Sequence, residues 1–153
     1  MSRRKKLPHQ TCDGATHFVT FQRTKNVAVS LADPAIAPIT INALQHFAGS
    51  RYLLYDYTVM PDHVHVILKP LPREKGLEPL GRIVQSIKGW TARHINMVIG
   101  RRGAFWQDGS YDHIIRNRQD YEEKTKYIWN NPQVAGLVTD AERWPWSGRG
   151  QGE

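Results

Sequence analysis

The stretch YLLYDYTVMPDHVHVILK, residues 52–69, decides the fold of this chain. Two runs rich in β-forming residues, 52–60 and 63–69, stand on either side of the dipeptide Pro61-Asp62. A proline followed by an aspartate is a turn signal, and the flanking runs have the composition of strands. The stretch therefore predicts a β-hairpin near the middle of the chain.

The segments on both sides of the hairpin predict three helices and two further strands. Before the hairpin we expect a strand over 17–23, a loop over 24–38 broken by prolines, and a helix over 40–49. After it we expect a loop over 70–76, a long helix over 77–99, a β-rich stretch over 105–115, and a helix over 120–131 that Pro132 ends. This order predicts an α+β fold of ferredoxin-like type, with an antiparallel sheet and helices on one face.

Length and composition limit the class of protein. The 153 residues suffice for one domain, which we expect over 17–147, between a flexible basic arm at 1–16 and a disordered tail at 148–153. No apolar run is long enough to span a bilayer, and the charged start of the chain is unlike a secretory signal peptide, so we expect a cytoplasmic protein. The single cysteine, Cys12, excludes an internal disulfide and a cysteine-based zinc site.

The chain is basic, with 21 Lys and Arg against 14 Asp and Glu and a formal net charge of +7. This excess of positive charge favours a polyanionic partner. The candidate contacts to nucleic acid are Arg3, Arg4, Lys5 and Lys6 in the arm, Lys88 and Arg93 on the long helix, and Arg101, Arg102 and Arg116 beyond it. The alternative is that these side chains form only a solvated surface.

Two histidines interrupt the aliphatic second run of the hairpin. Alternation along a strand places His63 and His65 on one face, about 7 Å apart along the backbone, and Val64 and Val66 on the other face. Two imidazoles in this arrangement can bind one divalent cation if a third ligand comes from elsewhere. The alternative is a pair of partly exposed histidines with no ligand.

The last predicted helix carries a tyrosine and an asparagine four residues apart. Tyr127 and Asn131 therefore share a face of this helix, whereas Tyr121 lies about 240° around it from Tyr127. An amide oxygen and a phenol on one face can supply a metal ligand and a nucleophile. The alternative is that the phenol packs at the boundary of the core.

Several motifs then follow one another in a recognisable order. They are MPDHVH at 60–65, RIVQSIK at 82–88, FWQ at 105–107, YDHIIR at 111–116, YIWNNP at 127–132, AGLV at 135–138 and WPWS at 144–147. With these motifs the chain resembles the REP-associated tyrosine transposases, members of the single-tyrosine HUH superfamily related to the transposases of small insertion sequences. The resemblance extends from about residue 17 to residue 147.

The resemblance implies a ferredoxin-like domain of the HUH single-strand nuclease type that cleaves and rejoins single-stranded DNA next to small hairpins. It implies that Tyr127 forms a 5′-phosphotyrosine, and that His63, His65 and Asn131 bind Mg²⁺ or Mn²⁺. The implied partner is single-stranded or hairpin DNA containing REP-like elements, with no membrane partner and with a monomer or homodimer as the assembly. Asparagine is frequent in the family where this chain has Asp62, which we expect to matter little because it lies outside the ligand set.

Two other functions fit the same residues. One is a non-catalytic module that binds hairpin DNA or RNA on the same fold. The other is a metal nuclease that uses water at the histidine pair.

Among the other tyrosines, we expect Tyr52, Tyr55 and Tyr57 to pack, whereas Tyr111 is expected to hold either the sheet or the DNA.

Overall fold

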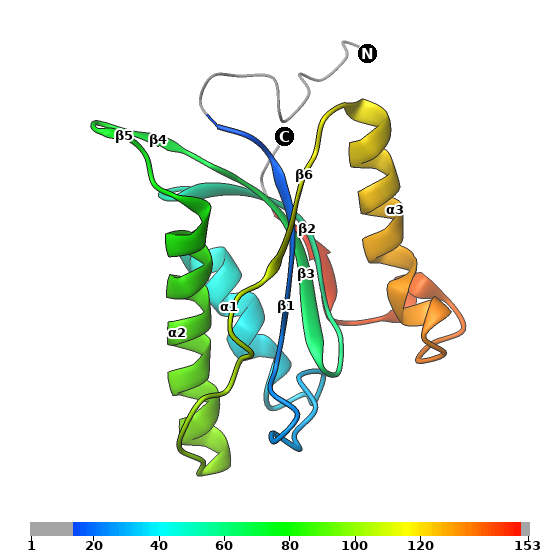
Figure 1. The fold of residues 1–153 in the computed structure, drawn as a ribbon. Helices are drawn as coiled ribbons and strands as arrows, with labels where there is room; N and C mark the ends of the chain where they lie inside the picture. The colour runs from blue at the N-terminus through cyan, green and yellow to red at the C-terminus, as the bar shows by residue number, and fades with distance from the viewer. Residues whose placement is uncertain (1–13, 151–153) are drawn as a thin grey trace.

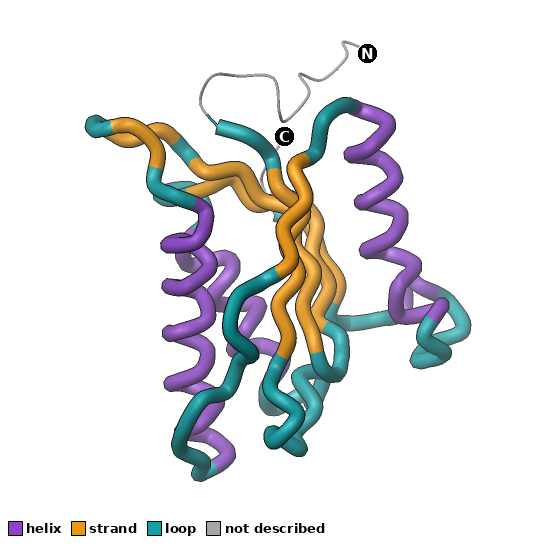
Figure 2. The backbone as a smooth tube through the Cα atoms, in the orientation of Figure 1, coloured by secondary structure: helices purple, strands orange, loops and turns teal. Residues whose placement is uncertain are grey.

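The computed structural model describes residues 14–150, which form a five-stranded antiparallel sheet and three α-helices (Figures 1 and 2). The strands of the sheet are β1 (His17–Gln22), β2 (Tyr52–Val59), β3 (His63–Pro70), β6 (Tyr111–Ile114) and β7 (Ser147–Arg149). The helices are α1 (Ala37–Phe47), α2 (Leu80–Ile99) and α3 (Arg118–Val134), with a short 3₁₀ helix, η1 (Ala141–Arg143). A separate small hairpin joins β4 (Pro72–Arg73) to β5 (Gly76–Leu77).

The strand order, β6-β1-β3-β2-β7, confirms the predicted ferredoxin-like arrangement. The hairpin of β2 and β3 lies at the centre, and β1 pairs with the free side of β3. Because β1 and β2 both run antiparallel to β3, the connection through α1 is a split β-α-β unit. Within residues 14–150, no helix has the combination of length and apolar character that a membrane span requires.

The helices cover both faces of the sheet, so the prediction of helices on one face is wrong. On one face, α1 and α2 bury a large apolar cluster that includes Val64, Val66 and Ile87. On the other face, α3 packs on a smaller cluster built around Phe18, Ile67 and Ile128. Figure 1 shows α3 on the opposite side of the sheet from the other two helices. The buried strands carry apolar residues on both faces, and this leaves room for a helix on each.

Prolines lie inside two helices whose bounds differ from those predicted from the sequence. Helix α1 begins at Ala37, before Pro38, because a proline in the first turn needs no intrahelical N–H partner. Helix α3 continues through Pro132 to Val134, so the prediction that Pro132 ends it is wrong. Pro132 is buried, and its packing offsets the lost backbone hydrogen bond.

The C-terminal segment of the described chain returns to the sheet. Strand β7 pairs with β2 and includes Gly148 and Arg149, so the ordered domain extends beyond the predicted boundary at Ser147. A Cβ atom on Gly148 would overlap the ring of Tyr57, which explains why the smallest residue stands there. At the other end Thr16, the last residue of the arm predicted over 1–16, is buried, and residues 1–13 of that arm lie outside the described residues.

Candidate active site

The two histidines of the hairpin and one tyrosine of α3 meet on the face of the sheet that α3 covers. The ring centroids of His63 and His65 are 4.6 Å apart, which confirms that both rings lie on one face of β3. The ring of Tyr127 approaches His65 with a centroid distance of 5.3 Å. Residues from a central strand and from the last helix are thus brought together, although more than 60 positions separate Tyr127 from the histidine pair.

His65 is held in one orientation by its surroundings. Its side chain is 5% exposed and stacks on Phe18 at 5.3 Å, and a hydrogen bond of 2.7 Å joins its Nδ1 to the hydroxyl of Thr20. Thr20 is the residue of β1 directly opposite His65 in the strand register. Burial, and to a smaller extent the neighbouring His63, lowers the pKa of His65 to about 3, so the imidazole is neutral at physiological pH.

His63 is oriented by the residue that precedes it. The Nδ1–H of His63 donates a hydrogen bond of 2.7 Å to the carboxylate of Asp62. This bond is the main reason that the pKa of Asp62 is lower than its ordinary value. A carboxylate on one ring nitrogen of a histidine orients the ring and makes its other nitrogen a stronger ligand. Asp62 therefore orients His63 in this site, and the expectation that Asp in place of Asn matters little stays a prediction.

Tyr127 and Asn131 lie on the same face of α3, one turn apart. Tyr127 is 51% exposed and lines a pocket of about 410 Å³ that Phe18, Thr20, His65 and Tyr111 also line. Tyr127 and Asn131 together line a second pocket of about 330 Å³ next to it. Tyr127 thus lies at the border of the two pockets.

Helix α3 is anchored to the sheet beside these residues. Ile128 is fully buried in the cluster on this face, and the indole N–H of Trp129 donates a hydrogen bond of 2.6 Å to Asp56. Asp56 is 1% exposed and also accepts a hydrogen bond of 3.1 Å from Arg149 on β7. These contacts determine which face of α3 turns toward the histidines.

The other tyrosines have different surroundings. Tyr52, Tyr55 and Tyr57 are buried, as expected from the sequence. Tyr121 packs edge-on against Tyr55, and burial raises its pKa to about 12, which makes its phenol a poor nucleophile. Tyr111 is 59% exposed and lines the same pocket as Tyr127.

Two ligand atoms of the predicted metal site are buried without hydrogen-bond partners. They are Nε2 of His65 and Oδ1 of Asn131, and neither finds a partner within residues 14–150. A buried polar atom left in this way is costly unless a ligand completes it. No cluster of three His, Cys, Asp or Glu side chains that could hold a metal ion occurs in the described part of the chain. Imidazole nitrogens and an amide oxygen are donor types that can bind a divalent cation.

The predicted nucleic-acid contacts lie on several sides of the molecule. Arg93 is exposed on α2, and Arg101 and Arg102 follow the end of this helix, across the sheet from the histidines. Arg116 is exposed between β6 and α3. The four basic residues of the arm lie outside the described residues. The sequence analysis did not single out Lys124 and Lys126, which line the two pockets beside Tyr127.

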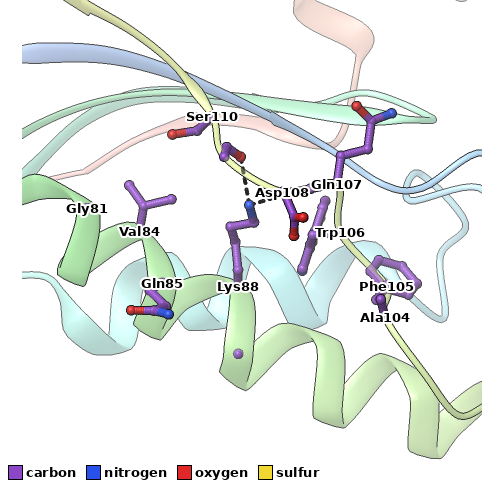
Figure 3. Close-up of a pocket in the computed structure, with 12 residues that line it drawn as sticks. Gly81, Val84, Gln85, Lys88, Ala104, Phe105, Trp106, Gln107, Asp108 and Ser110 are labelled. Carbon is purple, nitrogen blue, oxygen red and sulfur yellow. Dashed lines mark hydrogen bonds between the residues drawn. The ribbon is translucent and has the colours of Figure 1, made fainter.

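Lys88 has a structural position that its sequence context does not indicate. Its ammonium group donates hydrogen bonds of 2.7 Å to the backbone carbonyls of Gln107 and Gly109, as Figure 3 shows. Burial lowers the pKa of Lys88 below its ordinary value, and the neighbouring Asp108 opposes this shift. Lys88 therefore ties α2 to the segment that leads into β6, across a pocket of about 620 Å³.

We expect Lys88→Met to lower the free energy of unfolding by about 2 kcal/mol, because two hydrogen bonds from a charged donor are lost. Thermal or urea unfolding measures this effect. Arg93→Met, on the exposed surface of the same helix, is the matched control and should change stability by less than about 0.5 kcal/mol. Unchanged stability in Lys88→Met, together with weaker DNA binding, would instead make Lys88 a phosphate contact.

Comparison with known proteins agrees with this architecture. Residues 16–131 match the family model described as "Transposase IS200 like". The REP-associated tyrosine transposase of Escherichia coli (strain K12) is 31% identical over 91 residues, covering 60% of this chain and 50% of that protein. The chain thus spans about half the length of this curated relative.

A solved structure resembles nearly the whole chain. The structure of a REP-associated tyrosine transposase bound to a REP hairpin superposes with a TM-score of 0.71 and 25% sequence identity. The match covers 94% of this chain and 79% of that one. The family model covers both histidines, Tyr127 and Asn131, which are the residues that the fold brings to one face. The chain belongs to the IS200-like transposase family.

Proposed function

We propose that this protein cleaves and rejoins single-stranded DNA next to small hairpins through a 5′-phosphotyrosine intermediate on Tyr127. The observation that carries the proposal is the unpartnered Nε2 of the buried His65 beside the half-exposed Tyr127 ring. A neutral imidazole with a free nitrogen next to an accessible phenol suits a site that binds a cation and attacks a phosphate.

In this proposal, His63, His65 and Asn131 hold a divalent cation, Mg²⁺ or Mn²⁺. Such a cation, when bound, neutralises charge on the phosphate oxygens and makes the phosphorus more electrophilic. Asp62 and Thr20 keep the two imidazoles oriented through their Nδ1 atoms, which leaves both Nε2 atoms for binding. The low pKa of His65 prevents its protonation from competing with the cation.

The proposed chemical step is a transesterification at phosphorus. The phenolic oxygen of Tyr127 forms a bond to the phosphorus while the bond from the phosphorus to the 3′ oxygen breaks. The phenol loses one proton and the departing 3′ oxygen gains one, so the products are a 5′-phosphotyrosine and a free 3′-hydroxyl. Because one phosphodiester replaces another, the reverse attack by a 3′-hydroxyl rejoins the strand without a nucleotide cofactor.

The proposed substrate is a DNA hairpin with a single-stranded flank. Support comes from the solved relative bound to a REP hairpin and from the net charge of +7. Lys124 and Lys126 lie beside the pockets at Tyr127, where a negatively charged backbone would pass. A flexible single strand brings its backbone to this phenol more easily than a stacked duplex does.

The direct test is incubation of the protein with hairpin DNA labelled at its 3′ end and Mg²⁺ or Mn²⁺, followed by a denaturing gel. We expect a labelled band that migrates as a protein–DNA adduct. This band should be absent when EDTA removes the metal before the DNA is added. Peptide mapping of the adduct should find the DNA on Tyr127. Cutting without an adduct would favour the water-using nuclease, and hairpin binding with neither would favour the non-catalytic module.

We also expect the affinity for hairpin DNA to fall strongly as salt rises. Each phosphate that the protein neutralises should add roughly 0.7–0.9 to the slope of log affinity against log salt. Fluorescence anisotropy of a labelled hairpin over a series of salt concentrations measures this slope. A slope near zero would mean that the basic side chains are only a solvated surface.

A further inference from the structure

Tyr111 is an exposed aromatic residue that the proposed chemistry does not use. It begins β6, at the edge of the sheet, and 59% of its surface is exposed. It nevertheless lines the pocket that contains Tyr127 and His65. A large ring left exposed at the mouth of a candidate active site is available to a ligand.

Phe18 lies between the two exposed tyrosines. Its ring is 4% exposed, and Tyr111 and Tyr127 both approach it edge-on, with centroid distances of 6.4 Å and 6.0 Å and interplanar angles of 75° and 77°. Both phenol rings therefore pack in an edge-to-face arrangement against the buried ring of Phe18. Phe18 also lines the pocket of about 410 Å³.

The backbone that carries Tyr111 is held on two sides. Tyr111 is directly opposite Thr20 in the pairing of β6 with β1, and Thr20 is the residue that orients His65. The preceding segment is tied to α2 by Lys88, which donates to the carbonyl of Gly109 two positions before Tyr111 (Figure 3). A ring on such a backbone loses little freedom when a ligand stacks on it.

We propose that Tyr111 is a base-binding residue: its ring stacks on an unpaired nucleobase next to the phosphate that Tyr127 attacks, and so positions the strand. This inference rests on the proposed function, because the ligand is the DNA strand that enters that site. Stacking on an aromatic side chain requires only the face of a base and tolerates any base identity. Loss of one such contact typically weakens binding about 10- to 100-fold.

The test compares Tyr111→Ala, Tyr111→Leu and Tyr111→Phe with the wild-type protein on one hairpin substrate. Adduct formation is measured with protein in excess, after the cleavage site has been mapped with the wild-type protein. We expect the half-saturating concentration to rise about 10- to 100-fold for the Ala and Leu variants and to stay unchanged for Phe, which keeps the aromatic face. Leucine fills much of the volume of the tyrosine ring, whereas alanine does not. Weaker binding in both Tyr111→Ala and Tyr111→Leu is therefore not explained by loss of side-chain volume.

Two modified substrates make the test specific for stacking. One substrate has an abasic site on the 5′ side of the cleaved phosphate, and another has it on the 3′ side. One of the two should weaken adduct formation by the wild-type protein to the level of Tyr111→Ala, and the same substrate should leave adduct formation by that variant unchanged. With 2-aminopurine placed at each position of the single-stranded flank in turn, binding to a Tyr127→Phe protein should quench the fluorescence at one position, and binding to Tyr127→Phe/Tyr111→Leu should not. This second readout needs no cleavage.

The outcomes separate this inference from the proposed function. No adduct with the wild-type protein contradicts the proposed function, and the fluorescence readout still decides the role of Tyr111. A normal adduct in Tyr111→Ala at the wild-type half-saturating concentration overturns the stacking role. Loss of the adduct in Tyr111→Phe also overturns it, because a hydroxyl and not a ring face would then be required.

Discussion

Tyr127→Phe is expected to abolish the covalent protein–DNA adduct and to leave hairpin binding intact. The variant removes only the phenolic oxygen that attacks phosphorus, so the rate of adduct formation should fall by more than about 1,000-fold. The ring contacts with Phe18 and His65 remain, and because half of the side chain is exposed, stability should change by less than about 0.5 kcal/mol. A denaturing gel for the adduct and anisotropy for binding measure the two properties.

Tyr121→Phe is the matched control for this experiment. It removes a phenolic oxygen from the same helix, one that faces the cluster around Tyr55 and not the histidines. We expect it to keep adduct formation at the wild-type rate. A Tyr127→Phe protein that still forms an adduct would contradict the assignment of the nucleophile, and mapping of that adduct would identify the tyrosine that acts instead.

Loss of a histidine ligand is expected to have the second large effect. His63→Ala should reduce metal-dependent cleavage by more than about 100-fold, because losing even an outer partner of a metal ligand costs about 10- to 100-fold. His63 is partly exposed, so its truncation leaves the core packed. His65→Ala is a poorer test, since this side chain is buried and stacked on Phe18 and its loss also leaves a cavity. His65→Gln keeps most of the volume and a polar group near Thr20.

Substitutions of Asp62, which precedes the proposed ligand His63, allow a graded comparison of metal dependence. Asp62→Ala removes the acceptor of the His63 Nδ1–H and should raise the metal concentration needed for half-maximal cleavage about 10- to 100-fold. Asp62→Asn keeps an oxygen acceptor and should be close to the wild type. Titration of Mn²⁺ against the rate of adduct formation distinguishes these cases. Equal metal dependence in all of these variants would mean that the cation is not bound at His63.

Local patterns in the sequence were sufficient for the central features of the fold. The β-rich runs on either side of Pro61-Asp62 predicted the β2–β3 hairpin, and period-two alternation predicted the common face of His63 and His65; both are confirmed. Helical spacing predicted the shared face of Tyr127 and Asn131, which line one pocket. These features depend on residues within a few positions of one another, for which backbone geometry alone decides where the side chains point.

Contacts between distant segments could not be obtained in this way. The sequence does not indicate that Thr20 stands opposite His65, because that pairing depends on the register between β1 and β3. Nor does it indicate that Lys88 ties α2 to the segment before β6, since a lysine on a helix is usually solvated.

The sequence by itself thus determined the family motifs, the hairpin with its histidine pair, and the helix that carries Tyr127. Only the tertiary structure decided that α3 covers the face of the sheet opposite α1 and α2, and that it continues past Pro132. The physical reason is burial: the central strands are apolar on both faces, and each face is covered by the helix whose apolar side fits it. That choice brings Tyr127 to His65 and Tyr111 to the mouth of the same pocket.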